Sequence, residues 1–243
     1  ILEAVRNCFA SLFTDRAISY RNTFGYSHFE VGLSVCIQKM VRSDMAASGV
    51  AFSLDPESGF KDVVVVNGSY GLGEMVVQGA VSPDEFIIFK PSLEKGFSSI
   101  IEKKIGYKDK KMIYGEDHGK LTKIVKVTDE QINKFSITDQ QALQIAKWVI
   151  SIEKYYSEIK GRWCPMDVEW AIDGITGELN IVQARPETIH SQKTEKTLVE
   201  YNIKTEGHKP VVEGIAVGDG VASGEVCVIH SLDTGDDSIF NNF

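Results

Sequence analysis

Two alternating segments, residues 165–172 and 179–188, constrain the fold of this chain more than any other feature. Apolar residues alternate with polar ones in both segments, and an Asp-Gly-Ile-Thr-Gly connection lies between them. This pattern is typical of two short antiparallel strands joined by a turn. We therefore predict a β-hairpin here and take it as the element around which the rest of the chain is organised.

The alternation assigns the side chains of this hairpin to two faces, because successive residues of a strand point to opposite sides. On the first segment, Asp167, Glu169 and Ala171 share one face. The opposite face of that segment carries three apolar residues: Met166, Val168 and Trp170. On the return segment, two small apolar residues alternate with a second set: Ile181, Gln183 and Arg185. One face of the hairpin is thus predicted to carry two carboxylates, a carboxamide and a guanidinium.

These groups suit a metal-bound polyphosphate. Carboxylate and amide oxygens are ligands for a hard cation such as Mg²⁺, and an arginine side chain forks onto phosphate oxygens. A hairpin with charged residues on one face is more often a sheet face that simply meets water. The rest of the chain has to separate these two interpretations.

The composition bounds the class of protein. At 243 residues the chain can hold one large domain or two modest ones. A formal net charge of -8 argues against general nucleic-acid affinity, since a phosphate backbone is normally met by a basic surface. Four scattered cysteines without a CxxC pair, no apolar run of membrane-spanning length and no signal peptide predict a cytoplasmic protein. Because the chain opens at Ile1 without Met, we expect a fragment of a longer polypeptide.

The pattern along the chain predicts mixed helix and sheet. Residues 1–24 favour one long amphipathic helix or two short ones, with Arg21 among its surface charges. A helix is predicted over residues 136–158, capped by Thr138 or Asp139. Outside the hairpin, strands are predicted over seven ranges: 34–41, 49–54, 61–67, 86–91, 100–105, 111–114 and 120–127.

Two further stretches offer contacts for a ligand. Residues 68–79 contain four glycines, which let the backbone approach something flat or phosphorylated, although a purely structural turn explains them as well. The stretch is neither a Walker A motif nor a Rossmann fingerprint. A lysine cluster is consistent with a phosphate site or, by default, with a solvated face: Lys103, Lys104, Lys108, Lys110 and Lys111.

Four separated motifs, in residues 71–85, 89–91, 165–170 and 181–188, resemble the phosphoenolpyruvate synthase (pyruvate, water dikinase) family of PEP-utilising enzymes. The resemblance runs through residues 1–190. It implies an α+β fold: an ATP-grasp-type nucleotide-binding domain that lacks its first lobe. The chain turns polar after His190, which predicts a linker at 191–209. The resemblance implies the start of a swivelling phosphohistidine domain at 210–243.

The family's reaction converts ATP, pyruvate and water to phosphoenolpyruvate, AMP and phosphate through a phosphorylated histidine, and it serves gluconeogenesis. The resemblance thus implies a phosphotransferase with ATP as substrate and Mg²⁺ as cofactor, and a homodimer for the full-length enzyme. Pyruvate and phosphoenolpyruvate would bind to domains outside this chain. The lysine and arginine of the missing lobe and the phosphorylated histidine are also outside it, so the fragment alone is expected to be inactive in the full reaction.

The resemblance assigns roles residue by residue. Three residues would form the hinge that hydrogen-bonds the adenine edge: Glu74, Met75 and Val76. Ser48 and Gly49 match a backbone turn that approaches the phosphates. Glu169 and Gln183 would hold Mg²⁺, with Asp167 close by, and Arg185 would neutralise the phosphoryl group during transfer.

Other functions remain open from the residues alone. Pyruvate phosphate dikinase and antibiotic-phosphorylating dikinases share the nucleotide domain, and the acceptor, phosphate or a drug, would separate them from a synthase. An alternative from another class is a non-catalytic interaction module whose glycines and charges are purely structural.

Overall fold

The computed structural model describes residues 1–117, 120–187, 207, 209, 221 and 223–224. These residues form two compact units, Ile1–Arg42 and the part that begins at Ser43. The predicted linker at 191–209 and the predicted phosphohistidine-domain start at 210–243 lie almost entirely outside the described residues.

The first unit contains two short helices, α1 (Leu2–Ala10) and α2 (Asp15–Phe24), with a 3₁₀ turn, η1 (Ser11–Phe13), between them. Thr14 has an extended backbone and therefore separates the helices, which confirms the second of the two predicted arrangements. Arg21 was expected on the surface but is only 4% exposed. Its Nε donates to His28 Nδ1 at 2.9 Å, and its guanidinium also donates to the Leu12 carbonyl.

The strand predicted over residues 34–41 is absent from the structure. The segment has the alternating pattern of a strand, but none of the described strands pairs with it, and Ile37 is 70% exposed. Alternation alone cannot supply the hydrogen-bond partner that a strand requires.

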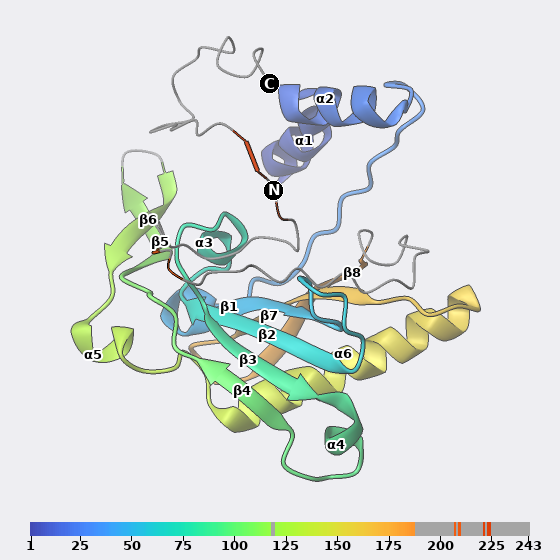
Figure 1. Ribbon diagram of the computed structural model, residues 1–243. Coiled ribbons are helices and arrows are strands. Elements are labelled where there is room, and N and C mark those ends of the chain that lie inside the picture. Colours follow the sequence, from blue (N-terminus) through green and yellow to red (C-terminus); the bar gives the residue numbers. More distant parts are fainter. Residues whose placement is uncertain (118–119, 188–206, 208, 210–220, 222, 225–243) are drawn as a thin grey trace. The chain divides into compact units, whose positions relative to one another are not determined.

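The second unit is built on a six-stranded antiparallel sheet with the strand order β4-β3-β2-β1-β7-β8. Figure 1 shows α6 (Asp139–Lys160) running beneath one face of this sheet, with α3 (Glu74–Val77) over the other. The strands are β1 (Ala47–Phe52), β2 (Val63–Tyr70), β3 (Asp84–Phe89), β4 (Ile100–Lys104), β7 (Met166–Ile172) and β8 (Leu179–Pro186). The smaller elements are η2 (Ser43–Met45), α4 (Lys90–Glu94), the separate hairpin β5 (Lys110–Asp117) with β6 (Lys120–Lys126), and α5 (Asp129–Ile132).

The long helix α6 begins and ends as its sequence predicts. Thr138 and Gln141 form a reciprocal capping box, in which each side chain accepts from the other residue's backbone amide. Gly161 ends the helix in the left-handed conformation, with φ 62°. The buried stripe of α6 packs on the apolar face of the sheet, so this face is closed to ligands and the opposite face is the one available for a site.

Trp170 lies at the centre of this core, with 1% of its surface exposed. Its indole occupies space that only glycine leaves free, because a Cβ added at Gly49 or Gly68 would lie 2.8 or 2.9 Å from the ring. At Gly49 the same Cβ would also lie 1.9 Å from the Asn67 carbonyl oxygen. Two of the glycines near the predicted site therefore act through packing of the sheet.

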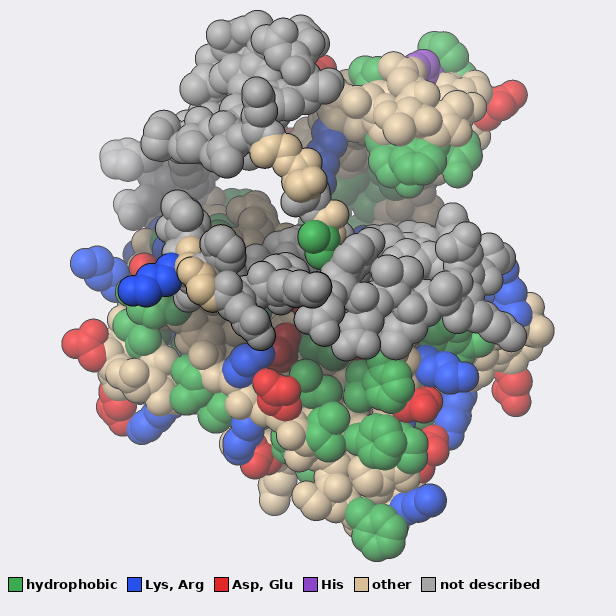
Figure 2. All heavy atoms as spheres, in the orientation of Figure 1, with side chains coloured by type: hydrophobic (Ala, Val, Ile, Leu, Met, Phe, Trp, Pro, Cys, Tyr) green, Lys and Arg blue, Asp and Glu red, His purple; other side chains and the backbone are tan. Residues whose placement is uncertain are grey.

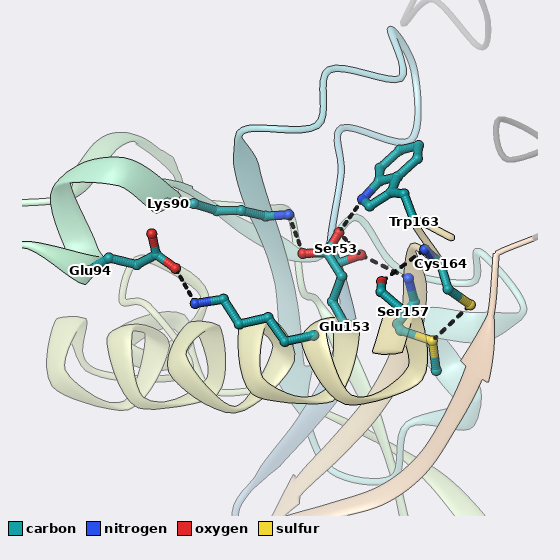
Figure 3. Close-up of polar contacts among 9 residues, drawn as sticks. Ser53, Lys90, Glu94, Glu153, Ser157, Trp163 and Cys164 are labelled. Atoms are coloured by element: carbon teal, nitrogen blue, oxygen red, sulfur yellow. Dashed lines mark hydrogen bonds and ion pairs between the residues drawn. The ribbon is translucent and has the colours of Figure 1, made fainter. Parts of the chain in front are cut away.

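A buried polar network fixes β7 to β1 and α6 (Figure 3). Glu153 of α6 is 7% exposed and accepts from Lys90 at 2.6 Å, from Trp163 at 2.8 Å and from Ser53 at 3.2 Å. Ser53 Oγ in turn accepts from the Met166 amide at 2.8 Å. This network holds the beginning of β7 against the end of β1, next to the face that carries Asp167.

Candidate functional site

The predicted hairpin is present as β7 and β8. Its turn is closed by Asp173, whose carboxylate accepts from the amides of Ile175 and Thr176, and by Gly177 in the left-handed conformation. Asp167 pairs with Arg185, and Glu169 pairs with Gln183, so the four predicted polar residues form two adjacent cross-strand pairs. Directly opposite residues of an antiparallel pair share one face.

One assignment within the hairpin is wrong. The register shifts between Glu169 and Trp170, and Ile181 pairs with Trp170 on the core face, not with the polar set. The shift leaves Val182 as the extra residue of a β-bulge, which reverses the alternation on β8.

A cavity of about 340 Å³ opens on the face of the sheet opposite α6. That size falls within the usual range of ligand pockets, about 300–1,000 Å³. The predicted quartet lines it: Asp167, Glu169, Gln183 and Arg185. The remaining wall is largely apolar and comes from other strands and from the helical turn α3: Val50, Phe52, Asn67, Val76, Val77, Pro83 and Val168. The cavity thus has a charged region and an apolar region, as a ligand with an anionic and a flat apolar part requires.

Arg185 and Asp167 form a weak ion pair in this cavity. Arg185 Nε lies 3.4 Å from Asp167 Oδ2, and the arginine side chain is 67% exposed. Pairs as exposed as this contribute about 0–1 kcal/mol to stability. Arg185 is therefore not committed to holding the fold, and its guanidinium is available to an incoming anion.

Burial acts on the Asp167 carboxyl more strongly than its partner does. Burial raises the pKa of Asp167 above its ordinary value, the Arg185 guanidinium opposes this rise, and the Glu187 carboxylate adds to it. Asp167 Oδ1 is also buried without a hydrogen-bond partner in the part of the chain that the structure describes. Buried carboxylate oxygens are nearly always paired, so this oxygen indicates a cation or a donor supplied by a ligand.

The expected hinge is a single helical turn, α3. The Val76 amide donates to the Gly73 carbonyl at 3.0 Å, and the Glu74 carbonyl accepts from the Gln78 amide at 2.9 Å. Met75 is buried in a small cluster with Val81 and Met112, and Val76 alone of the three predicted hinge residues lines the cavity. Their assigned contact with adenine stays a prediction.

Ser48 and Gly49 lie inside the central strand β1, not in a turn that precedes it, because β1 begins at Ala47. Ser48 donates its hydroxyl to the Gly71 carbonyl at 2.6 Å. Neither residue lines the cavity, and their assigned approach to the phosphates stays a prediction.

Sequence reasoning missed Asn67, which lines the cavity from β2. It follows a run of four valines, and this run predicts a buried strand but not a ligand contact at its end. Its significance depends on the neighbouring strands, which no local pattern reveals.

The lysine cluster does not form one surface. Lys108 is fully buried and forms an ion pair with the equally buried Asp84, whereas the side chains of Lys103 and Lys104 on β4 are 41% and 69% exposed. None of the five lysines lines the cavity. On the face drawn in Figure 2, Lys and Arg side chains are interspersed with Asp and Glu, as expected for a solvated surface.

No helix in the described ranges is long and apolar enough to span a membrane. No group of three or more His, Cys, Asp or Glu side chains gathers within the described ranges in a way that could hold a metal ion. Cys8, Cys36 and Cys164 are free thiols, whereas Cys227 lies outside the described residues.

Comparison with known proteins places this site in a family. Residues 1–205 match the model of the pyruvate phosphate dikinase AMP/ATP-binding domain. The phosphoenolpyruvate synthase of Aquifex aeolicus is 57% identical over 240 residues, which cover 97% of this chain and 28% of that protein. Those of Synechocystis and Escherichia coli are 52% and 49% identical and cover 96% of the chain. The chain spans about 28% of the length of these relatives. It belongs to the pyruvate phosphate dikinase AMP/ATP-binding domain family.

Proposed function

We propose that this chain is the ATP-binding part of a phosphoenolpyruvate synthase and that it transfers a phosphoryl group from ATP to a histidine elsewhere in the full-length protein. The observation that carries the proposal is the single cavity in which Asp167, Glu169, Gln183 and Arg185 meet an apolar wall. The fold would be of ATP-grasp type, with this cavity as its nucleotide site. The residues from 210 onward would begin the swivelling phosphohistidine domain.

The residues present fit a magnesium ion. Two carboxylates and a carboxamide supply the oxygen ligands that Mg²⁺ prefers, and Asp167 Oδ1 is buried without a partner among the described residues. Glu169 and Gln183 would hold the ion with Asp167 nearby. When bound, it would offset negative charge on the phosphate oxygens.

The chain's own contribution is positional and electrostatic. Phosphoryl transfer requires little covalent chemistry from the protein beyond alignment and positive charge near the moving oxygens. Arg185 projects from β8 into the cavity with most of its side chain exposed, which suits a guanidinium that contacts the phosphoryl group only during transfer. The apolar wall would hold the nucleoside.

Replacing Arg185 with alanine, or Glu169 with alanine, is expected to lower the rate of histidine phosphorylation at least about 10²-fold in the full-length protein, with little change in stability. The readout is acid-labile label incorporated from radiolabelled ATP. Arg162→Ala is the matched control, because Arg162 is exposed and lies outside the cavity. Near-normal rates in both site variants would refute the assignment. Phosphate-dependent turnover of pyruvate would indicate a pyruvate phosphate dikinase instead.

A further inference from the structure

Asn67 lies in one row of side chains that crosses the sheet on its cavity face. Asn67 pairs with Val50 of β1, and Val50 pairs with Glu169 of β7. All three residues line the cavity. Asn67 is therefore two strand spacings, roughly 10 Å, from Glu169.

The carboxamide oxygen of Asn67 lacks a hydrogen-bond partner among the described residues. This atom, Oδ1, is buried. Ser69 Oγ, two residues along the same strand, is likewise unpaired, but Ser69 does not line the cavity. Buried polar atoms are rarely left unpaired, so the Asn67 oxygen at the cavity wall indicates a hydrogen-bond donor on the ligand.

The Asn67 oxygen is not a ligand of the magnesium ion assigned to Glu169. Two oxygens bound to one Mg²⁺ are at most about 4 Å apart, since each lies about 2.1 Å from the ion. Side chains on one sheet face project roughly parallel to one another. With Val50 between them and a backbone separation of roughly 10 Å, side chains that project in parallel keep the two oxygens apart, so we do not place Asn67 among the ligands of that ion.

The surroundings of Asn67 suit a flat base. The apolar part of the cavity wall comes from Val50, Val76, Val77 and Pro83, and Asn67 contributes a polar side chain to this wall. The backbone of α3 offers little to read a base, because the Val76 amide and the Glu74 carbonyl are already hydrogen-bonded within the turn. A side-chain carboxamide on β2 remains able to do so.

We propose that Asn67 is a specificity-determining residue that reads the adenine edge of the nucleotide. The proposal rests on the proposed function, since it assumes that ATP binds in this cavity. An asparagine carboxamide accepts from the exocyclic amine of adenine and donates to the adjacent ring nitrogen; guanine presents donor and acceptor in the reverse order, which a carboxamide matches only after turning over. Recognition of the base would then come from β2 and recognition of the phosphates from β7 and β8.

The test is Asn67→Asp in the full-length protein, with dissociation constants for ATP and GTP measured by calorimetry. The substitution preserves shape but replaces the amide donor with a second acceptor. That acceptor pair repels the adenine ring nitrogen and can accept from two N–H groups of guanine. The ratio of the GTP to the ATP dissociation constant is expected to fall on the order of tenfold to a hundredfold.

Ser69→Ala is the matched control, because it removes the other unpaired oxygen on this face of β2 without touching the cavity. It is expected to leave the ratio unchanged. An unchanged ratio in Asn67→Asp, or equal weakening of both nucleotides, would overturn the role of Asn67 while leaving ATP binding intact. A wild-type protein that binds no ATP would instead remove the proposed function itself.

Discussion

Replacing Lys108 with methionine is expected to destabilise the protein by about 3 kcal/mol. Lys108 and Asp84 are both 0% exposed, and they form an ion pair. Removing one partner of a buried pair typically costs about 3–5 kcal/mol, because the other charge is left uncompensated. Here the loss should lie near the lower end, since Asp84 also accepts from the Gly106 amide at 3.0 Å and from the Ser136 amide at 2.6 Å.

Urea unfolding of the variant and the wild type measures this loss, and Lys104→Met is its control. Lys104 belongs to the same sequence cluster, but it is 69% exposed and its carboxylate partners lie 3.4 and 3.9 Å away. Its replacement should change the free energy of unfolding by less than about 0.5 kcal/mol. Equal effects of the two substitutions would show that the buried pair does not support the fold. Adding Asp84→Asn to Lys108→Met should recover part of the loss, because no buried charge remains.

Replacing Gly49 with alanine is expected to cost about 3 kcal/mol of unfolding free energy, the upper end of the usual range for overpacking. The added Cβ would lie 1.9 Å from the Asn67 carbonyl oxygen, which belongs to the backbone of β2 and cannot rotate away. It would also contact the Trp170 ring at 2.8 Å. Relief therefore requires β1 and β2 to separate beneath the cavity, so ATP affinity should fall together with stability.

Gly32→Ala provides the comparison for this substitution, because no atom lies within 4 Å of the position its Cβ would take. Its unfolding free energy should stay within about 0.5 kcal/mol of the wild type. Thermal or urea unfolding of both variants decides the matter. If Gly49→Ala unfolded at the wild-type midpoint, the close approach of β1 to β2 would not be the constraint described here.

The sequence predicted the parts of this fold that depend on local pattern. The alternation through residues 165–172 places Asp167 and Glu169 on one face, and the capping residues of α6 lie where Thr138 and Gly161 predict them. These features need only the period of the element and the chemistry of its ends.

The predictions that were wrong or incomplete concern residues whose surroundings are set by segments distant in the sequence. The segment 34–41 alternates as a strand does, but it has no neighbour to pair with among the described strands. Lys108 looks like its surface neighbours until Asp84 is placed beside it by the fold. Asn67 gains its place in the cavity from β1, which pairs with its strand, and from β7, which pairs with the other side of β1.

The bulge at Val182 also determines how a change in loop length would affect the side chains of β8. The side chains of a strand change faces with every residue, so a slip of one position would turn Gln183 and Arg185 toward α6 and bring apolar residues to the cavity. The extra residue absorbs such a slip between the loop and the charged pairs. Loop length at residues 173–178 and the alignment of the ligand-facing groups are thereby uncoupled, and a longer loop would leave the charged end of the cavity undisturbed.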